Sequence, residues 1–251
     1  MRTIAVFTAL RVEMSPIKAL FSGFDQVNRM TPMYIGEAEG KRVILVCSGV
    51  GKERSLKAAD FIMARYSPEG ALSAGFCGGL VPELRSSDVV LSSWVISSAD
   101  ESHGDSKKLF LRDQTVSLKK ALSGKGIGSQ IGGFITVRRP LISPGKRSTL
   151  AQRTGAMVAE METFHLAEFF LDREIPFVGV RVVVDGSDDR LPLLGPFMER
   201  SGETRLLRAL WHLVSDRSAL LQLRRLYRNA RRAQVTLAVT VPTVIAVWPE
   251  N

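Results

Sequence analysis

Three carboxylates follow one another along the chain, each in a setting suited to acid–base chemistry. Glu13 follows an apolar opening run, Glu162 closes the string MVAEME, and Asp185 ends the run FVGVRVVVD. Cleaving a bond between a sugar and a nitrogenous base requires an acid at the base, an activated nucleophile below the sugar, and an anchor for the sugar hydroxyls. Three carboxylates can fill these roles when their environments give them different pKa values.

A glycine-dense segment, GFCGGL, lies between the first two carboxylates. It follows a strand-like stretch at 70–74, and we expect residues 75–79 to form a turn. The segment lacks the G-x-G-x-x-G spacing of dinucleotide-binding loops, and residues 144–148 lack the upstream glycine of a phosphate-binding P-loop. The three histidines are widely separated and have no metal-ligand spacing. We therefore expect neither a cofactor nor a metal.

The elements that must position these residues alternate in type. Apolar and β-branched runs predict strands, and apolar residues at helical spacing predict helices. The predicted strands cover 3–9, 42–47, 70–74, 89–93, 132–137 and 177–184. The predicted helices cover 53–66, 116–122 and 163–173. This alternation indicates an α/β fold built on one sheet.

Composition narrows the class of protein further. The chain has 251 residues, of which 45% are hydrophobic and 24% charged, as in a globular domain with a sizeable core. Its two cysteines, Cys47 and Cys77, argue against a disulfide framework and indicate a reducing compartment. The apolar run 3–10 is short and interrupted by Arg11 and Glu13, so it favours a first strand over a signal peptide. No apolar run approaches the length of a membrane-spanning helix.

The positive charge is concentrated near the end of the chain. Residues 204–232 hold eight arginines and one acid, and so supply +7 of the net charge of +9. On a helical wheel they form an amphipathic helix with apolar and basic sides. Its apolar side holds Leu220, Leu223, Leu226, Tyr227 and Ala230, and its basic side holds Arg217, Arg224, Arg225, Arg228, Arg231 and Arg232.

Such a helix can lie on an anionic membrane, bind nucleic acid, or dock on its own fold with a solvated face. No nucleic-acid-binding signature accompanies it, so a nucleic-acid partner is not expected. The membrane and docked alternatives both stay open. Residues 235–248 then become β-branched and apolar, with a break at Pro242, and the sequence pattern alone does not place them.

Taken together, GFCGGL, the EME string and the strand ending in Asp185 resemble the nucleoside phosphorylase superfamily. The resemblance covers about residues 3–190 and is strongest to the hydrolytic branch, the methylthioadenosine/S-adenosylhomocysteine nucleosidases, and to the hopanoid-associated phosphorylase group. It implies a three-layer α/β/α fold with a mixed, partly barrel-like sheet, and a homo-oligomer. We expect residues 1–200 to form the catalytic domain and 201–251 a basic amphipathic C-terminal extension that belongs to the same folding unit.

The resemblance also implies roles for the three carboxylates. Glu13 corresponds to the base that activates the attacking water, Glu162 to the ligand of the ribose hydroxyls, and Asp185 to the general acid at the imidazole ring of a purine. Met161 would pack on the sugar. The alternatives are a solvated loop acid for Glu13, a helix N-terminal acid for Glu162 and a helix N-cap for Asp185.

Further substrate contacts are expected at Glu160, Gly75, Phe76 and Arg181. Residues two apart in an extended segment point to the same side. Glu160 would therefore face the sugar beside Glu162, and Arg181 would lie on the same side of its strand as Asp185. Gly75 and Phe76 belong to the glycine-rich segment.

The same segment bears on the nucleophile. Phosphorylases of this superfamily bind phosphate with an arginine two residues before the first glycine and with a serine or threonine just after it. Ser73 and Phe76 occupy these positions here, which favours water. Arg11 or Arg181 could still provide an anion site, so phosphate stays open.

The expected activity is purine nucleoside hydrolysis that releases adenine, with methylthioadenosine-type nucleosides as the general substrate class and adenosylhopane as the most specific candidate. The alternatives are a phosphate-dependent phosphorylase, and a non-catalytic protein that binds a nucleoside or a lipid. We expect a cytoplasmic protein whose partner is a small or lipid-linked nucleoside, with peripheral contact at the anionic inner membrane face as a further hypothesis.

Overall fold

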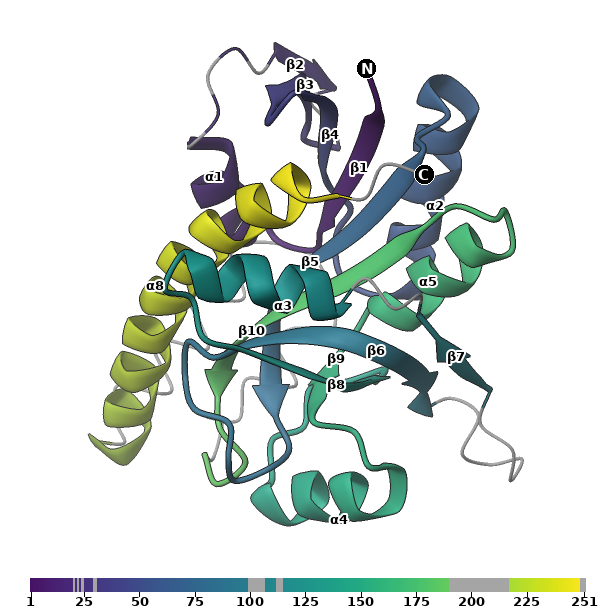
Figure 1. The fold of residues 1–251 in the computed structure, drawn as a ribbon. Helices are drawn as coiled ribbons and strands as arrows, with labels where there is room; N and C mark the ends of the chain where they lie inside the picture. The colour runs from purple at the N-terminus through teal and green to yellow at the C-terminus, as the bar shows by residue number, and fades with distance from the viewer. Residues whose placement is uncertain are drawn as a thin grey trace.

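A computed structural model describes residues 1–19, 21, 23, 25–28, 31–98, 107–111, 115–189 and 217–248. Their core is a 10-stranded mixed sheet with helices packed on both faces (Figure 1). Consecutive strand residues alternate between the two faces: Ile4 and Val6 of the first strand contribute to one apolar core, and Ala5 and Phe7 to the other. The expected three-layer α/β/α fold is confirmed.

The strands are β1 (Thr3–Thr8), β2 (Asp25–Asn28), β3 (Met33–Ala38), β4 (Lys41–Cys47), β5 (Gly70–Gly79), β6 (Val89–Ser97), β7 (Lys108–Phe110), β8 (Ser129–Thr136), β9 (Val158–Glu160) and β10 (Phe177–Asp185). The helices are α1 (Arg11–Ala19), α2 (Lys52–Tyr66), α3 (Thr115–Gly124), α4 (Pro144–Thr154), α5 (Thr163–Leu171) and α8 (Arg217–Ala246). The sequence patterns did not predict β2, β3, β7, β9, α1 or α4.

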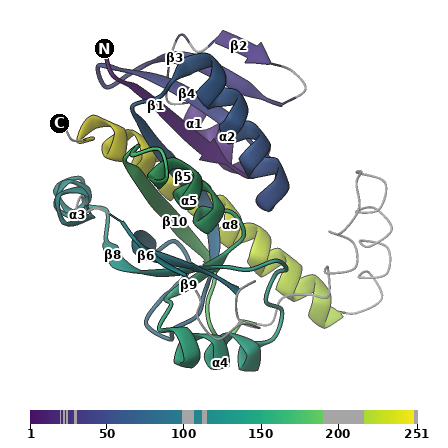
Figure 2. The same ribbon diagram turned by 90° about the vertical axis from the view of Figure 1, so that its right-hand side faces the viewer.

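The two cores divide the helices between the faces of the sheet. One core contains residues of α1, α3 and α8, and the other contains residues of α2 and α5. Helix α4 lies at the end of the molecule away from α2 (Figure 2). Strands β5, β10, β6, β8 and β9 pair in a closed ring, which gives the sheet its barrel-like part.

The expectation of a turn at residues 75–79 is wrong, because β5 continues as a strand to Gly79. Its first half pairs with β1 and its last residues pair with β9. The glycines are required by close approach rather than by a reversal of the chain. A Cβ on Gly75 would lie 2.7 Å from Oε1 of Glu13, and a Cβ on Gly78 would lie 3.2 Å from Oδ2 of Asp185.

Helix α8 differs from the predicted amphipathic segment in two ways. The run 235–248 continues the helix to Ala246 with Pro242 inside it, and Leu237, Val241 and Trp248 are buried in the core. Tyr227, placed on the apolar side by the helical wheel, is 67% exposed. Leu226 and Ala230, from the predicted apolar side, pack against the core, and Arg224, Arg225, Arg228, Arg231 and Arg232 are exposed. Residues 204–216 of the predicted helix lie outside the described residues.

In the described part of the chain, no helix combines the length and apolar character needed to cross a membrane.

Candidate active site

The site lies where β1, β5 and β10 end, because parallel strands bring their carboxyl ends to the same edge of a sheet. A cavity of about 390 Å³ opens there, and most of the residues that line it are apolar. Glu13, Glu162 and Asp185 all border it, although they come from three distant parts of the sequence. Helix α8 contributes Leu226 and Ala230 to its wall.

Glu13 lies in the first turn of α1 and is buried, so the alternative of a solvated loop acid is wrong. Its Oε2 accepts hydrogen bonds from the backbone N–H groups of Ala9 (3.0 Å) and Leu10 (2.8 Å), and its Oε1 accepts one from Phe76 (2.8 Å). The side chain is buried, and burial raises its pKa against the opposing effect of these bonds. Glu13 is therefore a fixed group with a basicity above that of an ordinary carboxylate.

Glu162 precedes α5 but makes no side-chain hydrogen bond that caps the helix. Its Oε1 accepts a hydrogen bond from the backbone N–H of Gly51 at 2.9 Å, and its Oε2 lies 4.0 Å from Nη2 of Arg181. Burial and the nearby charge of Glu160 raise the pKa of Glu162 to about 8. Near neutrality this carboxyl group can therefore hold a proton.

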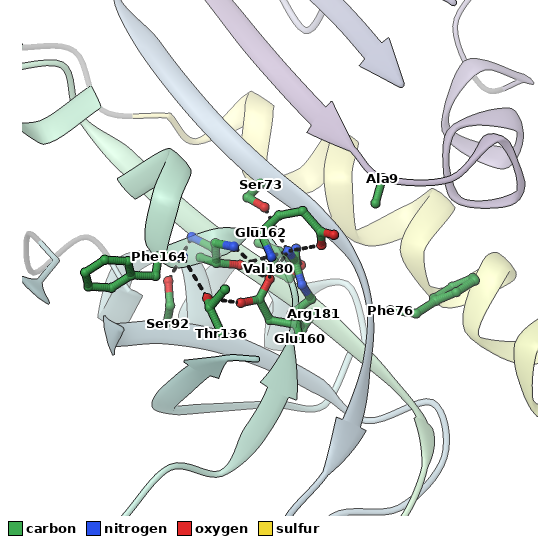
Figure 3. A network of polar contacts seen from close by, with 12 residues as sticks. Ala9, Ser73, Phe76, Ser92, Thr136, Glu160, Glu162, Phe164, Val180 and Arg181 are labelled. Atoms are coloured by element: carbon green, nitrogen blue, oxygen red, sulfur yellow. Dashed lines mark hydrogen bonds and ion pairs between the residues drawn. The ribbon is translucent and has the colours of Figure 1, made fainter. Parts of the chain in front are cut away.

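Glu160 ends β9 at the centre of a buried polar network (Figure 3). Its Oε1 accepts a hydrogen bond from Thr136, and its Oε2 accepts bonds from the backbone of Glu162 (2.9 Å) and Thr163 (2.8 Å) and from the Thr163 hydroxyl (2.6 Å). Burial raises its pKa, but the charge of Arg181 and these hydrogen bonds outweigh burial, so the pKa lies below its ordinary value. Glu160 is thus the ionised partner in this network.

Arg181 on β10 is the cation of the same network. Its Nη2 lies 2.7 Å from Oε2 of Glu160, and it donates hydrogen bonds to Thr163 (2.8 Å) and Ser73 (2.9 Å). The Nε of Arg181 is buried and has no hydrogen-bond partner among the described residues. One donor of this guanidinium is therefore available.

Asp185, the last residue of β10, forms an ion pair with Nη2 of Arg147 on α4. Burial raises the pKa of Asp185 and the charge of Arg147 opposes the rise; the net shift is upward. Residues 186–189, directly after Asp185, are not helical, and the backbone N–H of Gly186 donates to Asp189 at 2.9 Å. Asp189, rather than Asp185, is thus the residue that stabilises this turn.

The sequence patterns missed Arg147, although it is 2% exposed and lies in the cavity wall. No local signal distinguishes it, because Lys146 and Arg153 on the same helix are also basic. Only its contacts with Asp185 and Gly186 at the end of β10 identify it.

The remaining residues expected to contact substrate occupy different places. Met161 and Phe76 border the 390 Å³ cavity. The Phe76 side chain points away from the Arg181 network (Figure 3). Gly75 borders a second, much smaller cavity, about 10 Å³ in volume, together with Glu13, Glu162 and Arg181. Within the described residues, no group of acidic, histidine and cysteine side chains has the arrangement of a metal site.

Comparison with known proteins identifies the family of this chain. The sequence model of the phosphorylase superfamily matches residues 3–214. The 5'-methylthioadenosine/S-adenosylhomocysteine nucleosidase of Shewanella loihica is 28% identical over 171 residues, which cover 63% of this chain and 74% of the relative.

Two solved structures from Helicobacter pylori share the fold. The 5'-methylthioadenosine/S-adenosylhomocysteine nucleosidase, in complex with a pyrrolidine ligand, has a TM-score of 0.76 at 16% identity, covering 97% of each chain. A mutant of futalosine hydrolase has a TM-score of 0.77 at 15% identity, covering 98% of this chain and 99% of its own. The chain belongs to the phosphorylase superfamily, and the curated relatives that it matches are nucleosidases, which are N-glycosyl hydrolases.

Proposed function

We propose that this protein hydrolyses the N-glycosidic bond of a purine nucleoside and releases adenine. One observation carries the proposal: three buried carboxyl groups with raised pKa values, Glu13, Glu162 and Asp185, border one cavity. The curated nucleosidase relatives support the same reaction class.

Each carboxyl group suits one part of this reaction. Asp185, whose pKa is raised by burial, donates a proton to the imidazole-ring nitrogen of the purine, and the C–N bond breaks with its electron pair leaving on the base. In its ionised form, Glu162 accepts hydrogen bonds from the sugar hydroxyls and stabilises the positive charge that develops on the sugar. Glu13 takes a proton from the attacking water, whose oxygen bonds to the anomeric carbon.

The small cavity beside Glu13 fits the nucleophile. Its volume of about 10 Å³ is close to the minimum for one water molecule, and Glu13, Ser73 and Arg181 supply polar atoms around it. The unpartnered Nε of Arg181 is a suitable donor to that water. Ser73 already accepts a hydrogen bond from Arg181, and the Phe76 ring offers phosphate no donor, so water is the nucleophile we propose.

The other predicted contact residues then have three kinds of role. Glu160 and Arg181 support the site rather than contact the substrate, because their hydrogen bonds fix Glu162 and the start of α5. Met161 and Phe76 form apolar wall for the sugar and its 5' substituent. Gly75 contributes space, since a side chain there would collide with Glu13.

The apolar lining of the cavity favours a nucleoside with an apolar 5' substituent, such as methylthioadenosine. Adenosylhopane is the finer candidate. It is supported by α8, which lines the cavity with Leu226 and Ala230 and carries five exposed arginines further around its surface. We further propose that the enzyme is cytoplasmic and binds the anionic inner membrane face through these arginines. We also propose that it assembles as a homo-oligomer.

The deciding experiment measures adenine released from methylthioadenosine with and without inorganic phosphate. We expect release at the same rate in both, with the free 5-methylthioribose as the second product. A sugar 1-phosphate product, formed faster as phosphate is added, would make the protein a phosphorylase. Binding of the nucleoside without release of base would instead make it a binding protein.

A further inference from the structure

Arg147 connects two walls of the active-site cavity. It lies near the start of α4 and is among the largest fully buried side chains of the described residues. Its Nε and Nη2 donate to the carbonyl oxygen of Leu141 at 3.0 and 2.8 Å, and its Nη1 donates to that of Gly186 at 2.6 Å. The same Nη2 pairs with the carboxylate of Asp185. One guanidinium thus joins the segment before α4 to the end of β10.

These contacts fix the geometry around Asp185 from both sides. Leu141 lies in a segment without regular secondary structure that borders the cavity, and Gly186 directly follows Asp185. Backbone carbonyl groups buried without a donor are costly, so Arg147 determines where both segments can lie. An arginine is suited to this task because its planar fork can reach several acceptors at once.

We propose that Arg147 is a positioning residue that makes Asp185 an effective proton donor to the leaving base. This inference rests on the proposed function, in which Asp185 is the acid. When the proton moves from Asp185 to the purine ring, a carboxylate is left in a buried site. A buried carboxylate without a cation is strongly destabilised. Arg147 stabilises this product of proton transfer and so favours the transfer.

Other charged groups around Asp185 either raise its pKa, opposite to the effect of Arg147, or affect it more weakly. Asp189 follows β10, and its charge raises the pKa of Asp185. Asp189 is itself paired with Arg225 of α8 at 3.0 Å, and this cation partly offsets the effect of the Asp189 charge on Asp185. Cys77 on β5 is also near Asp185: burial and, to a lesser extent, the charge of Asp185 raise the pKa of its thiol. Arg147 is the cation that directly contacts the carboxylate.

The test compares Arg147→Gln, which removes the charge, with Arg147→Lys, which keeps the charge but loses the fork. The protonation midpoint of Asp185 is measured by carboxyl ¹³C NMR without any ligand, with Asp185→Asn used to assign the signal. Adenine release from methylthioadenosine is then measured across pH. Asp189→Asn serves as a control that should shift the protonation midpoint of Asp185 in the opposite direction.

We expect Arg147→Gln to raise the midpoint by about one pH unit or more, since a carboxylate loses a stabilising cation. The alkaline limb of the rate profile should move to higher pH, and kcat should fall. Arg147→Lys should lower kcat with a smaller shift of the midpoint, and Asp189→Asn should lower the midpoint.

An unchanged midpoint in Arg147→Gln would overturn the inference. If Arg147→Gln does not fold, the Arg147→Lys variant tests the inference instead. A kcat of Arg147→Lys equal to that of wild type would then overturn the positioning role. A wild-type protein that releases no base would contradict the proposed function alone, because the NMR midpoints still test the effect of Arg147 on Asp185.

Discussion

Oε1 of Glu13 accepts a hydrogen bond from the backbone N–H of Phe76 at 2.8 Å, which ties the first helix to the glycine-rich strand β5. Two further N–H groups bind the other oxygen of the same carboxyl group. The proposed base is therefore held by the backbone alone, in a position that a flexible side chain would not keep by itself. This bond depends on Gly75, since any side chain there would occupy the space of Glu13.

Replacing Glu13 by Gln should reduce turnover of methylthioadenosine by about 10²-fold or more, because the amide cannot accept the proton of the attacking water. The rate of adenine release measures this effect. Circular dichroism should show an unchanged fold, because Gln retains an oxygen that can accept one of the backbone bonds. A rate within threefold of wild type would remove Glu13 from the mechanism.

Asp185→Asn should also lower turnover by about 10²-fold or more, through loss of the general acid. Burial raises the pKa of Asp185, so the wild-type rate should fall as pH rises through that pKa and the acid loses its proton. The variant should lack this alkaline limb. The pH profile of kcat measures both effects, and a limb that persists in the variant would assign it to another group.

Glu162→Gln should lower turnover but stabilise the fold at alkaline pH. Folding raises the pKa of Glu162 to about 8, so the wild-type protein loses stability as pH rises from the ordinary carboxyl pKa of 4.5 towards 8. Gln does not titrate and avoids this loss. At about 1.4 kcal/mol per pH unit, the gain is of the order of a few kcal/mol.

Urea unfolding of both proteins at pH 5 and pH 8 measures the effect of Glu162→Gln. The variant's advantage in free energy of unfolding should be larger at pH 8. An equal difference at both pH values would show that Glu162 does not titrate in this range.

Trp248→Ala tests the proposal that α8 folds together with the catalytic domain. Trp248 is buried in the core, and its ring lies against Gly70 of β5, where an added Cβ would be 2.7 Å from Nε1. Loss of the ring should cost about 3–5 kcal/mol of the free energy of unfolding. Thermal unfolding should show one transition at a lower temperature. A separate early transition would instead make α8 an independent extension.

Reversal of three exposed arginines of α8, Arg224, Arg228 and Arg231, to Glu tests the proposed membrane contact. Each basic residue near an anionic surface contributes about 1 kcal/mol, so binding to phosphatidylserine-containing vesicles should weaken at least tenfold. Vesicle co-sedimentation at low and high salt measures the binding of both proteins. Wild-type binding should decline as salt rises.

The matched control reverses Lys119, Lys120 and Lys125, which are exposed on α3 and just after it and give the same change in charge. This control should retain most of the vesicle binding, and both variants should keep the turnover of soluble methylthioadenosine. Equal losses in the two variants would show that net charge alone attracts the protein to the vesicles. Wild-type protein that ignores anionic vesicles at low salt would leave α8 as a docked helix with a solvated face.

The sequence alone determined the alternation of strands and helices and the order of Glu13, Glu162 and Asp185, because burial and strand ends leave local patterns. The α/β fold and the superfamily could therefore be predicted. The sequence did not predict α1, because the apolar residues of this helix are few and Pro16 interrupts their pattern. The continuation of β5 through its glycines also went unpredicted, since glycine signals a turn locally and only the neighbouring Glu13 and Asp185 explain it.

The tertiary structure decided what these residues can do. Arg147 lies 38 positions from Asp185 and Gly51 lies 111 positions from Glu162, and no local pattern encodes such contacts. The protonation state of each carboxyl group depends on burial and on charges brought near by folding, which are absent from an unfolded chain. The long helix α8 was likewise fixed by tertiary packing, because burial of its β-branched residues outweighs their weak helical preference and Pro242.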